Sequence, residues 1–310
     1  GRDGHAAGAD ALMGSVDIIT PPPFVAGRFD GMPATQYHAI EAVGSGGVKK
    51  LLQSPAHFVV ERRKPKAPTD EMLFGSAVHY GVLEPNLFDQ HVGRVPADAP
   101  KRPTKTQLNA KKPSPETLAQ IDWWEEFERG DGAREIVLDA DAYERCCRTV
   151  DAILAHPGAR TLLTGGIPEV SLFWNDAKYE VPCKARIDFL RDDGGMVDIK
   201  TTTDASPEGF GRTIASFLYH VQGSHYWSGG EHVLGASPKF FAFIAAEKEE
   251  PFGVSAQVLQ VDALRIGMAK CDRALRRYAE AAASGRWGAY SDLIEPAILP
   301  AWALREAVIL

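Results

Sequence analysis

The chain has 310 residues, of which 45% are hydrophobic and 24% charged, and its formal net charge is −7 at pH 7. This composition is typical of a globular protein with a sizeable core, and it argues against a surface coated with phosphate-binding cations, although a basic channel inside an acidic protein stays compatible with it. No apolar run approaches the roughly 20 residues that span a bilayer, and the first residues lack a signal-peptide core, so we expect a cytoplasmic protein with no membrane partner.

Residues 1–34 are rich in glycine, alanine and proline, which predicts a flexible N-terminal arm followed by a single domain over residues 35–310. Residues 95–115 are polar and rich in proline, and we expect a long mobile loop there. Apolar periodicity with suitable capping residues predicts helices over 45–54, 56–63, 69–84, 114–129 and 140–155.

The second half of the chain changes to strand patterns. Strands are expected over 168–175, 180–190, 195–202, 239–246 and 253–259, with helices over 207–233 and 262–284. Helices followed by three antiparallel strands, a helix and a further strand predict an α/β fold with a central mixed β-sheet flanked by helices.

A hairpin around the polar turn at 191–195 holds the most informative residues. Asp198 and Lys200 are two positions apart, so on a strand their side chains leave the same face, and the hairpin brings Asp188 alongside them. Two carboxylates that hold divalent cations and an ammonium beside the attacking water or the scissile phosphate suit a metal-assisted phosphodiesterase. The alternative is a solvated surface hairpin, but the apolar neighbours favour a buried strand, where charges are costly unless they are paired or bound to metal.

The motifs resemble, in order and spacing, those of the PD-(D/E)xK nuclease superfamily. Within it they resemble the RecE (exonuclease VIII)-like exodeoxyribonucleases, which are related to RecB nuclease domains and lambda exonuclease. The matching segments are 54–58, 75–79, 84–85, 169–174, 184–188, 198–202, 222–226 and 243–251. The resemblance covers roughly residues 45–283 and implies a restriction-endonuclease-like core. Ile187 precedes Asp188 where the superfamily name implies a proline, which RecB-like members commonly lack.

The resemblance implies roles for the residues of the metal site. Asp188 and Asp198 would bridge two Mg²⁺ ions, which Mn²⁺ could replace, with the carbonyl of Ile199 and the side chain of His79 as further ligands. Lys200 would orient or deprotonate water, or offset charge on the phosphorus; otherwise it is a salt-bridge partner without a role in catalysis. His79 could also be an ordinary core histidine.

Further candidates surround this group. Glu169 heads a strand and either reaches the metal cluster or is an exposed carboxylate. Gln222 and Tyr226 share one helix face and either contact the DNA phosphate or position Lys200, or else form an amphipathic helix edge. Lys184 and Arg186 alternate toward the face of Asp188, where they would bind phosphates or neutralise the carboxylates. Further candidates for DNA-backbone contacts are Arg62, Arg63, Lys101, Arg102 and Lys105, although such charge runs are usually solvated.

The resemblance implies a Mg²⁺-dependent exodeoxyribonuclease, encoded by a bacterium or phage, that degrades one strand from double-stranded DNA ends. It further implies 5′-to-3′ polarity, 3′ overhangs that a single-strand annealing protein uses in recombination, and a homo-oligomeric ring that encloses the DNA. Two alternatives stay open: a structure-specific or restriction-like endonuclease of the same fold, and a non-catalytic DNA-binding recombination scaffold. The three costly charges at 188, 198 and 200 count against the scaffold.

Overall fold

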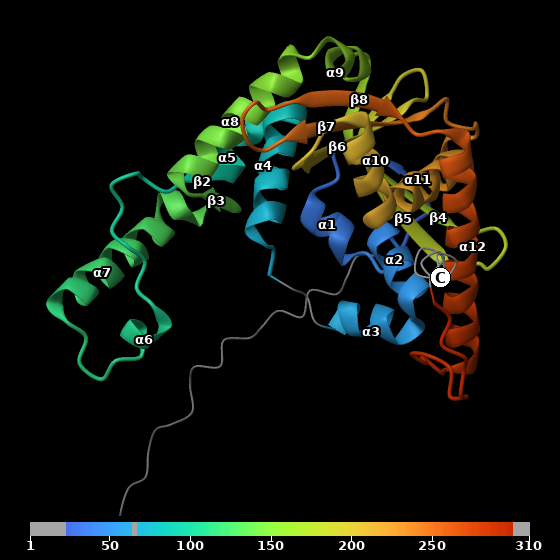
Figure 1. Cartoon of the computed structure of the whole chain (residues 1–310), viewed down its shortest axis with the longest axis horizontal. Helices are drawn as coiled ribbons and strands as arrows, with labels where there is room; N and C mark the ends of the chain where they lie inside the picture. Colours follow the sequence, from blue (N-terminus) through green and yellow to red (C-terminus); the bar gives the residue numbers. More distant parts are fainter. Residues whose placement is uncertain (1–22, 64–66, 300–310) are drawn as a thin grey trace, which may run out of the picture.

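The computed structural model describes residues 23–63 and 67–299. Six strands form one mixed sheet in the order β1-β4-β5-β6-β7-β8 (Figure 1). Strands β6 and β7 are parallel, and the other neighbouring pairs are antiparallel. The strands are β1 (Gly27–Phe29), β4 (Gly166–Asn175), β5 (Pro182–Arg191), β6 (Met196–Thr202), β7 (Phe241–Glu247) and β8 (Val254–Val258). This sheet, with helices on both faces, confirms the predicted α/β restriction-endonuclease-like fold.

Five helices pack on one face of the sheet. They are α2 (Ser45–Gln53), α3 (Pro55–Arg63), α10 (Pro207–Ser216), α11 (Tyr219–Leu234) and α12 (Val261–Ser284). The core between these helices and the strands includes Leu51, Ile187, Phe241 and Phe243, all fully buried or nearly so. Each such side chain contributes about 1.5–3 kcal/mol by leaving water, so the hairpin strands are firmly held against α11.

The opposite face is covered in two parts. Helices α4 (Asp70–Leu83), α8 (Ala140–Ala155) and α9 (Pro157–Leu162) bury Val197, Ile199 and Ile244. Near the other edge, α1 (Ala34–Ala39) and β1 pack around Phe173 of β4. Because strand side chains alternate between faces, the valine and isoleucine that flank Asp198 anchor β6 to α4 while Asp198 faces α11.

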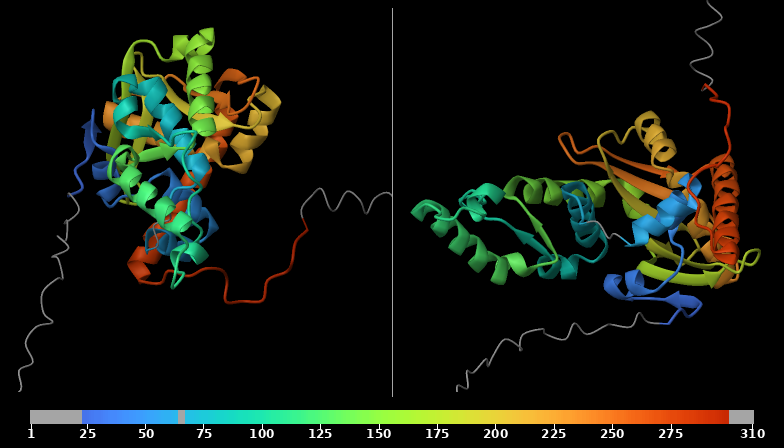
Figure 2. Two further views of the ribbon diagram at one scale, coloured as in Figure 1. Left: turned by 90° about the vertical axis from the view of Figure 1, so that its left-hand side faces the viewer. Right: turned by 90° about the horizontal axis from the view of Figure 1, so that it is seen from below.

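A lobe projects from the body of the molecule (Figure 2). It contains α5 (Pro85–His91), β2 (Val92–Arg94), α6 (Lys105–Leu108), α7 (Pro115–Arg129), a 3₁₀ turn (Asp131–Ala133) and β3 (Ile136–Leu138), with β2 and β3 paired in parallel. The predicted long loop of residues 95–115 was therefore wrong in part, because it includes α6. Thr104 and Gln107 form a capping box that starts this short helix, and Trp124 Nε1 donates to the Pro100 carbonyl at 3.1 Å.

Two further expectations are corrected. The flexible arm was predicted to extend to residue 34, but Gly27–Phe29 forms β1 and pairs with β4; residues 1–22 lie outside the described residues. The helix predicted over 207–233 is two helices, because Leu218 adopts a left-handed backbone (φ 55°) between α10 and α11. Within the described ranges, no helix is long and apolar enough to cross a membrane.

The close approach of α11 and α12 gives a test of the fold. A Cβ at Gly267 would lie 2.4 Å from the His220 carbonyl oxygen, a backbone atom that cannot easily move. Gly267→Ala should therefore lower the free energy of unfolding by about 1–3 kcal/mol, as overpacking does. The matched change Gly211→Ala, in α10 with no atom within 4 Å of the new Cβ, should raise it by about 0.5–1 kcal/mol. Urea unfolding midpoints measure both; equal stability of the two variants would contradict the close packing.

Candidate active site

Asp188 lies where β5 separates from β6. The ladder between these strands consists of Phe189 with Val197 and Leu190 with Met196, and it ends just before Asp188. In place of the next ladder bond, the N–H of Ile199 donates to Asp188 Oδ2 at 2.7 Å. A side-chain carboxylate thus accepts a strand amide that would otherwise be unpaired, which fixes its orientation at the opening of the sheet.

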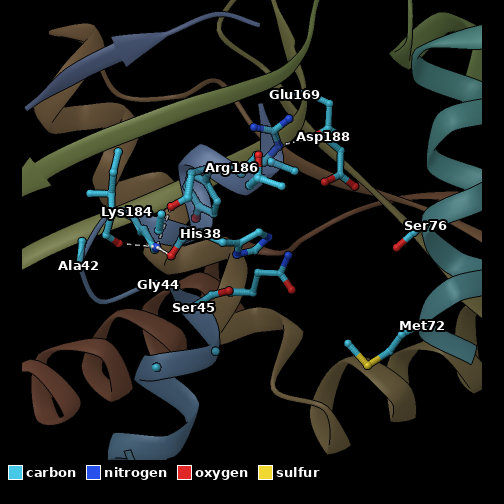
Figure 3. Close-up of a pocket in the computed structure, with 18 of the residues that line it drawn as sticks. His38, Ala42, Gly44, Ser45, Met72, Ser76, Glu169, Lys184, Arg186 and Asp188 are labelled. Atoms are coloured by element: carbon cyan, nitrogen blue, oxygen red, sulfur yellow. Dashed lines mark hydrogen bonds and ion pairs between the residues drawn. The ribbon is translucent and has the colours of Figure 1, made fainter. Parts of the chain in front are cut away.

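Glu169 lies opposite Asp188 on the other neighbouring strand, and its backbone is unusual. The β4–β5 ladder pairs Pro168 with Phe189 and Val170 with Ile187 but omits the position between them. There Glu169 has a φ of 53°, a left-handed conformation that costs a non-glycine residue about 1–2 kcal/mol. A short ion pair with Arg186, in which both side chains are largely buried, holds the carboxylate of Glu169 beside that of Asp188 (Figure 3).

Together with His79 of α4, these two carboxylates form a group that could hold a metal ion. One ligand atom from each of His79, Glu169 and Asp188 lies within 4.8 Å of the others. Nε2 of His79 lies 3.0 Å from the carbonyl oxygen of Ile199 and 3.6 Å from Asp188 Oδ2. Two carboxylates and a carbonyl are the oxygen ligands that hard divalent cations such as Mg²⁺ or Mn²⁺ prefer, and the imidazole offers one nitrogen beside them.

The electrostatics of Asp188 fit a bound cation. Burial, and then the nearby Asp198 carboxylate, raise the pKa of Asp188 to about 7. The ionised form is therefore destabilised in the protein alone, and a divalent cation would compensate for the lost hydration. The predicted role of Asp188 as a ligand agrees with this geometry, and Glu169 joins it more closely than the sequence could decide.

Asp198 and Lys200 form a pair beside this group. Asp198 is 1% exposed; its Oδ1 accepts from Gln222 Nε2 at 2.6 Å, and its Oδ2 makes a short ion pair with Lys200. Burial acts to lower the pKa of Lys200, but Asp198 and Asp188 outweigh it, so the pKa is raised and the ammonium stays charged. Asp198 is outside the convergent group of His79, Glu169 and Asp188, and its role as a metal ligand stays a prediction.

Helix α11 supplies the two other predicted residues. Gln222 holds Asp198, so it positions Lys200 indirectly, in keeping with one of its two expected roles. Tyr226 is 8% exposed, packs edge-on against Phe241 at 6.1 Å, and has its pKa raised well above the usual value by burial. Both side chains line an open cleft of about 1190 Å³, which His79, Glu169 and Asp188 also line. Figure 3 shows Met72 and Ser76 of α4 facing Glu169 and Asp188 across this cleft.

Lys184 does not have the position that a DNA contact requires. Its ammonium is buried and donates to the carbonyl oxygens of Tyr37, His38 and Ile40 at 2.9, 3.3 and 2.7 Å. The backbone of Val43 also exchanges hydrogen bonds with Pro182 and Lys184 of β5. The prediction that Lys184 contacts DNA is therefore corrected. Its buried ammonium anchors the end of α1 and the segment that follows it to strand β5.

The other cations predicted to contact DNA differ in how far they are already paired within the protein. Arg186 is held by Glu169 and donates to the Met32 carbonyl at 2.7 Å, so it supports the site instead of contacting substrate. Arg62 lines the cleft and pairs with Glu41, and Arg102 pairs with Glu128 while lying 4.1 Å from the centroid of Trp124. Arg63, Lys101 and Lys105 are exposed, and their contacts with DNA stay predictions.

Two residues near the site, Lys49 and Tyr219, were not predicted from the sequence. Lys49 of α2 and Lys200 each place an ammonium over the ring of Tyr219, at 5.0 and 5.1 Å from its centroid. In the sequence, Lys49-Lys50 is an ordinary basic pair on a predicted helix, and no local signal separates the lysine at the site from the other. Only the packing of α2 against the start of α11 brings Lys49 there.

Metal binding should depend on pH through Asp188. A cation binds the ionised carboxylate, and with its pKa raised to about 7 the protonated form prevails below that pH. Calorimetric Mn²⁺ affinity should thus fall about tenfold for each pH unit below 7 and level off above it. Asp188→Asn should bind weakly without this dependence, whereas His79→Gln should weaken binding and retain it. An Asp188→Asn variant with the wild-type profile would assign the dependence to another group.

The comparisons with known proteins agree with this geometry. The model of the family described as a PDDEXK-like domain of unknown function (DUF3799) matches residues 44–299. Among curated protein sequences, none matches significantly. Among solved structures, the crystal structure of a "Putative exonuclease" from Eubacterium rectale is similar, with a TM-score of 0.54 and 12% identity over 85% of this chain and 92% of that one. At this identity the likeness shows the fold alone.

The family match spans most of the chain and includes the described site from His79 to Tyr226. It confirms the expected superfamily, whereas the narrower RecE-like branch is not decided by it. The chain therefore belongs to the PDDEXK-like domain family DUF3799, within the PD-(D/E)xK superfamily.

Proposed function

We propose that this protein is a metal-dependent nuclease, and more narrowly an exodeoxyribonuclease that degrades one strand from double-stranded DNA ends. One observation carries the proposal. A charged lysine, Lys200, lies in an open cleft beside a convergent group of two carboxylates and a histidine. A bound cation and a positive side chain can both stabilise the charge that the phosphate of a phosphodiester gains in the transition state of its hydrolysis.

The residues of the site divide the chemistry between them. His79, Glu169, Asp188 and the Ile199 carbonyl would hold the cation, which when bound supplies Lewis acidity and lowers the pKa of a bound water. Lys200 would orient the attacking water and stabilise the charged phosphate. Because its pKa is raised, it acts as an ammonium and not as a base. Asp198 and Gln222 keep that ammonium in place.

The exonuclease reading is supported by the RecE-like order of motifs and by the name of the similar structure from Eubacterium rectale. From the same resemblance we propose a Mg²⁺ cofactor with two ions, 5′-to-3′ polarity, 3′ overhangs for a single-strand annealing partner in recombination, and a homo-oligomeric ring. A ring would reconcile the net charge of −7 with DNA binding if its cations face an inner channel. The proposed location is the cytoplasm of a bacterium, with a bacterial or phage gene.

The choice between the proposed exonuclease and its alternatives can be tested with three DNA forms. Linear duplexes labelled at the 5′ or the 3′ end should release labelled nucleotides from one end type only, whereas covalently closed circles should stay intact. EDTA should abolish release, Mg²⁺ or Mn²⁺ should restore it, and Ca²⁺ should support binding without cleavage, since its looser coordination does not hold the water in the required geometry. Cleavage of closed circles would indicate an endonuclease, and no release with any metal would indicate a scaffold.

Lys200→Ala should separate chemistry from binding. An interaction made only in the transition state lowers the rate without weakening substrate affinity. Loss of one charged stabiliser in a water-poor site costs on the order of 10² to 10³ in rate, about 3–4 kcal/mol. Single-turnover cleavage in Mg²⁺ and DNA affinity in Ca²⁺ should be measured together, with Lys239→Ala, 64% exposed after α11, as the control. Near-wild-type cleavage by Lys200→Ala would leave Lys200 a structural partner of Asp198.

A further inference from the structure

An exposed aromatic ring, that of Phe217, stacks on Tyr219, the residue whose ring lies beside the Lys200 ammonium. Phe217, between α10 and α11, is 62% exposed. Its ring stacks on that of Tyr219, with centroids 5.8 Å apart and an interplanar angle of 22°. Single exposed aromatic residues are common on proteins, so exposure alone indicates nothing. What distinguishes this ring is that it stacks on Tyr219, whose centroid lies 5.1 Å from the Lys200 ammonium.

The inner ring of the stack is fixed. Tyr219 lies 6.3 Å from Phe210 and 6.0 Å from Phe243, and both of these are fully buried core residues. The left-handed backbone of Leu218 (φ 55°) ends α10 and starts α11, which turns Phe217 outward while Tyr219 turns toward the core. Phe217 therefore presents a flat apolar face on a rigid support.

Two ammonium groups lie beside the same stack. Lys49 and Lys200 are 5.0 and 5.1 Å from the centroid of Tyr219. Lys200 is paired with Asp198, but among the described residues no carboxylate forms an ion pair with Lys49. Burial, and then the charge of Lys200, lower the pKa of Lys49 to about 8 despite the opposing effect of Asp198. The ammonium of Lys49 is repelled by that of Lys200, and an anion bound between the two lysines would stabilise both charges.

We infer that Phe217, Tyr219 and Lys49 bind the nucleotide next to the scissile phosphate, its base stacked on Phe217 and its phosphate on Lys49. This inference rests on the proposed nuclease function and adds a substrate class to it. Aromatic faces combined with cations are how proteins hold single-stranded nucleic acid without reading its sequence. Inside a duplex both faces of a base are covered by its neighbours, so the platform accepts only a terminal or unpaired base.

The test removes the aromatic ring of Phe217 from the protein and, separately, one base from the DNA. DNA ends that carry an abasic residue, moved one position at a time from the terminus, are bound to the protein in Ca²⁺. For wild type, one position should show about tenfold weaker binding, equal to about 1.4 kcal/mol. Phe217→Ala should bind intact DNA about tenfold more weakly and be insensitive to the abasic residue, whereas Phe217→Trp should behave as wild type. Ile266→Ala, a comparably exposed side chain of α12, is the matched control and should change nothing.

Lys49 is tested by salt dependence. Lys49→Gln should weaken binding of intact and abasic ends alike and reduce the slope of log affinity against log salt by about one, whereas Lys49→Arg should retain both. The inference is overturned if Phe217→Ala keeps the wild-type response to the abasic residue. It is also overturned if Phe217→Ala changes only the oligomeric state, because the ring is then a contact between subunits. Failure of the nuclease proposal would be seen separately, because the wild-type protein would then release no nucleotides from DNA. The binding measurements would still show whether Phe217, Tyr219 and Lys49 bind a terminal nucleotide.

Discussion

The hydrogen bond from the Ile199 N–H to the Asp188 carboxylate is the interaction on which the site depends. It closes the β5–β6 ladder with a side chain at the point where the strands separate, so the sheet can open without leaving a buried amide unpaired. The opening is what lets His79, Glu169 and the Ile199 carbonyl approach the same point. A carboxylate used in this way is both a structural element of the sheet and a group that favours a cation.

The charges around this point are arranged as two linked sets. In one, Arg186 balances Glu169, while Asp188 lines the cleft but is largely buried, which raises its pKa. In the other, Asp198 accepts a hydrogen bond from Gln222 at Oδ1 and forms an ion pair with Lys200 at Oδ2. Buried charges are costly unless each has a partner, and the raised pKa of Asp188 shows that its ionised form would gain from a bound cation. The strained backbone at Glu169 is consistent with a position held for chemistry rather than for stability.

Cation positions that look alike in sequence separate into three kinds in the structure. Lys184 anchors the segment before α2, and Arg186 holds the carboxylate of Glu169, so the charge of each is already paired within the protein. Lys200 is fixed at the centre of the site, and Lys49 approaches it across Tyr219. An acidic protein can therefore concentrate a few cations at the cleft without a basic surface, which agrees with its net charge of −7.

The sequence by itself determined strands β4 to β8, most of the longer helices and the residues Asp188, Asp198 and Lys200, because alternation, caps and turn residues act over a few positions of the chain. It did not predict the three-residue strands β1, β2 and β3. It also placed His79, Gln222 and Tyr226 on helices that meet the sheet. Only the tertiary structure decided that Glu169 joins His79 and Asp188, that the buried ammonium of Lys184 anchors the segment before α2, and that Lys49 and the stacked rings of Phe217 and Tyr219 lie near Lys200. These outcomes depend on the left-handed residues Glu169 and Leu218 and on contacts across more than a hundred residues. Neither the left-handed residues nor the long-range contacts produce a recognisable local sequence pattern. Packing among segments distant in the sequence determines which non-glycine residue adopts a left-handed backbone and which groups pair with a buried cation.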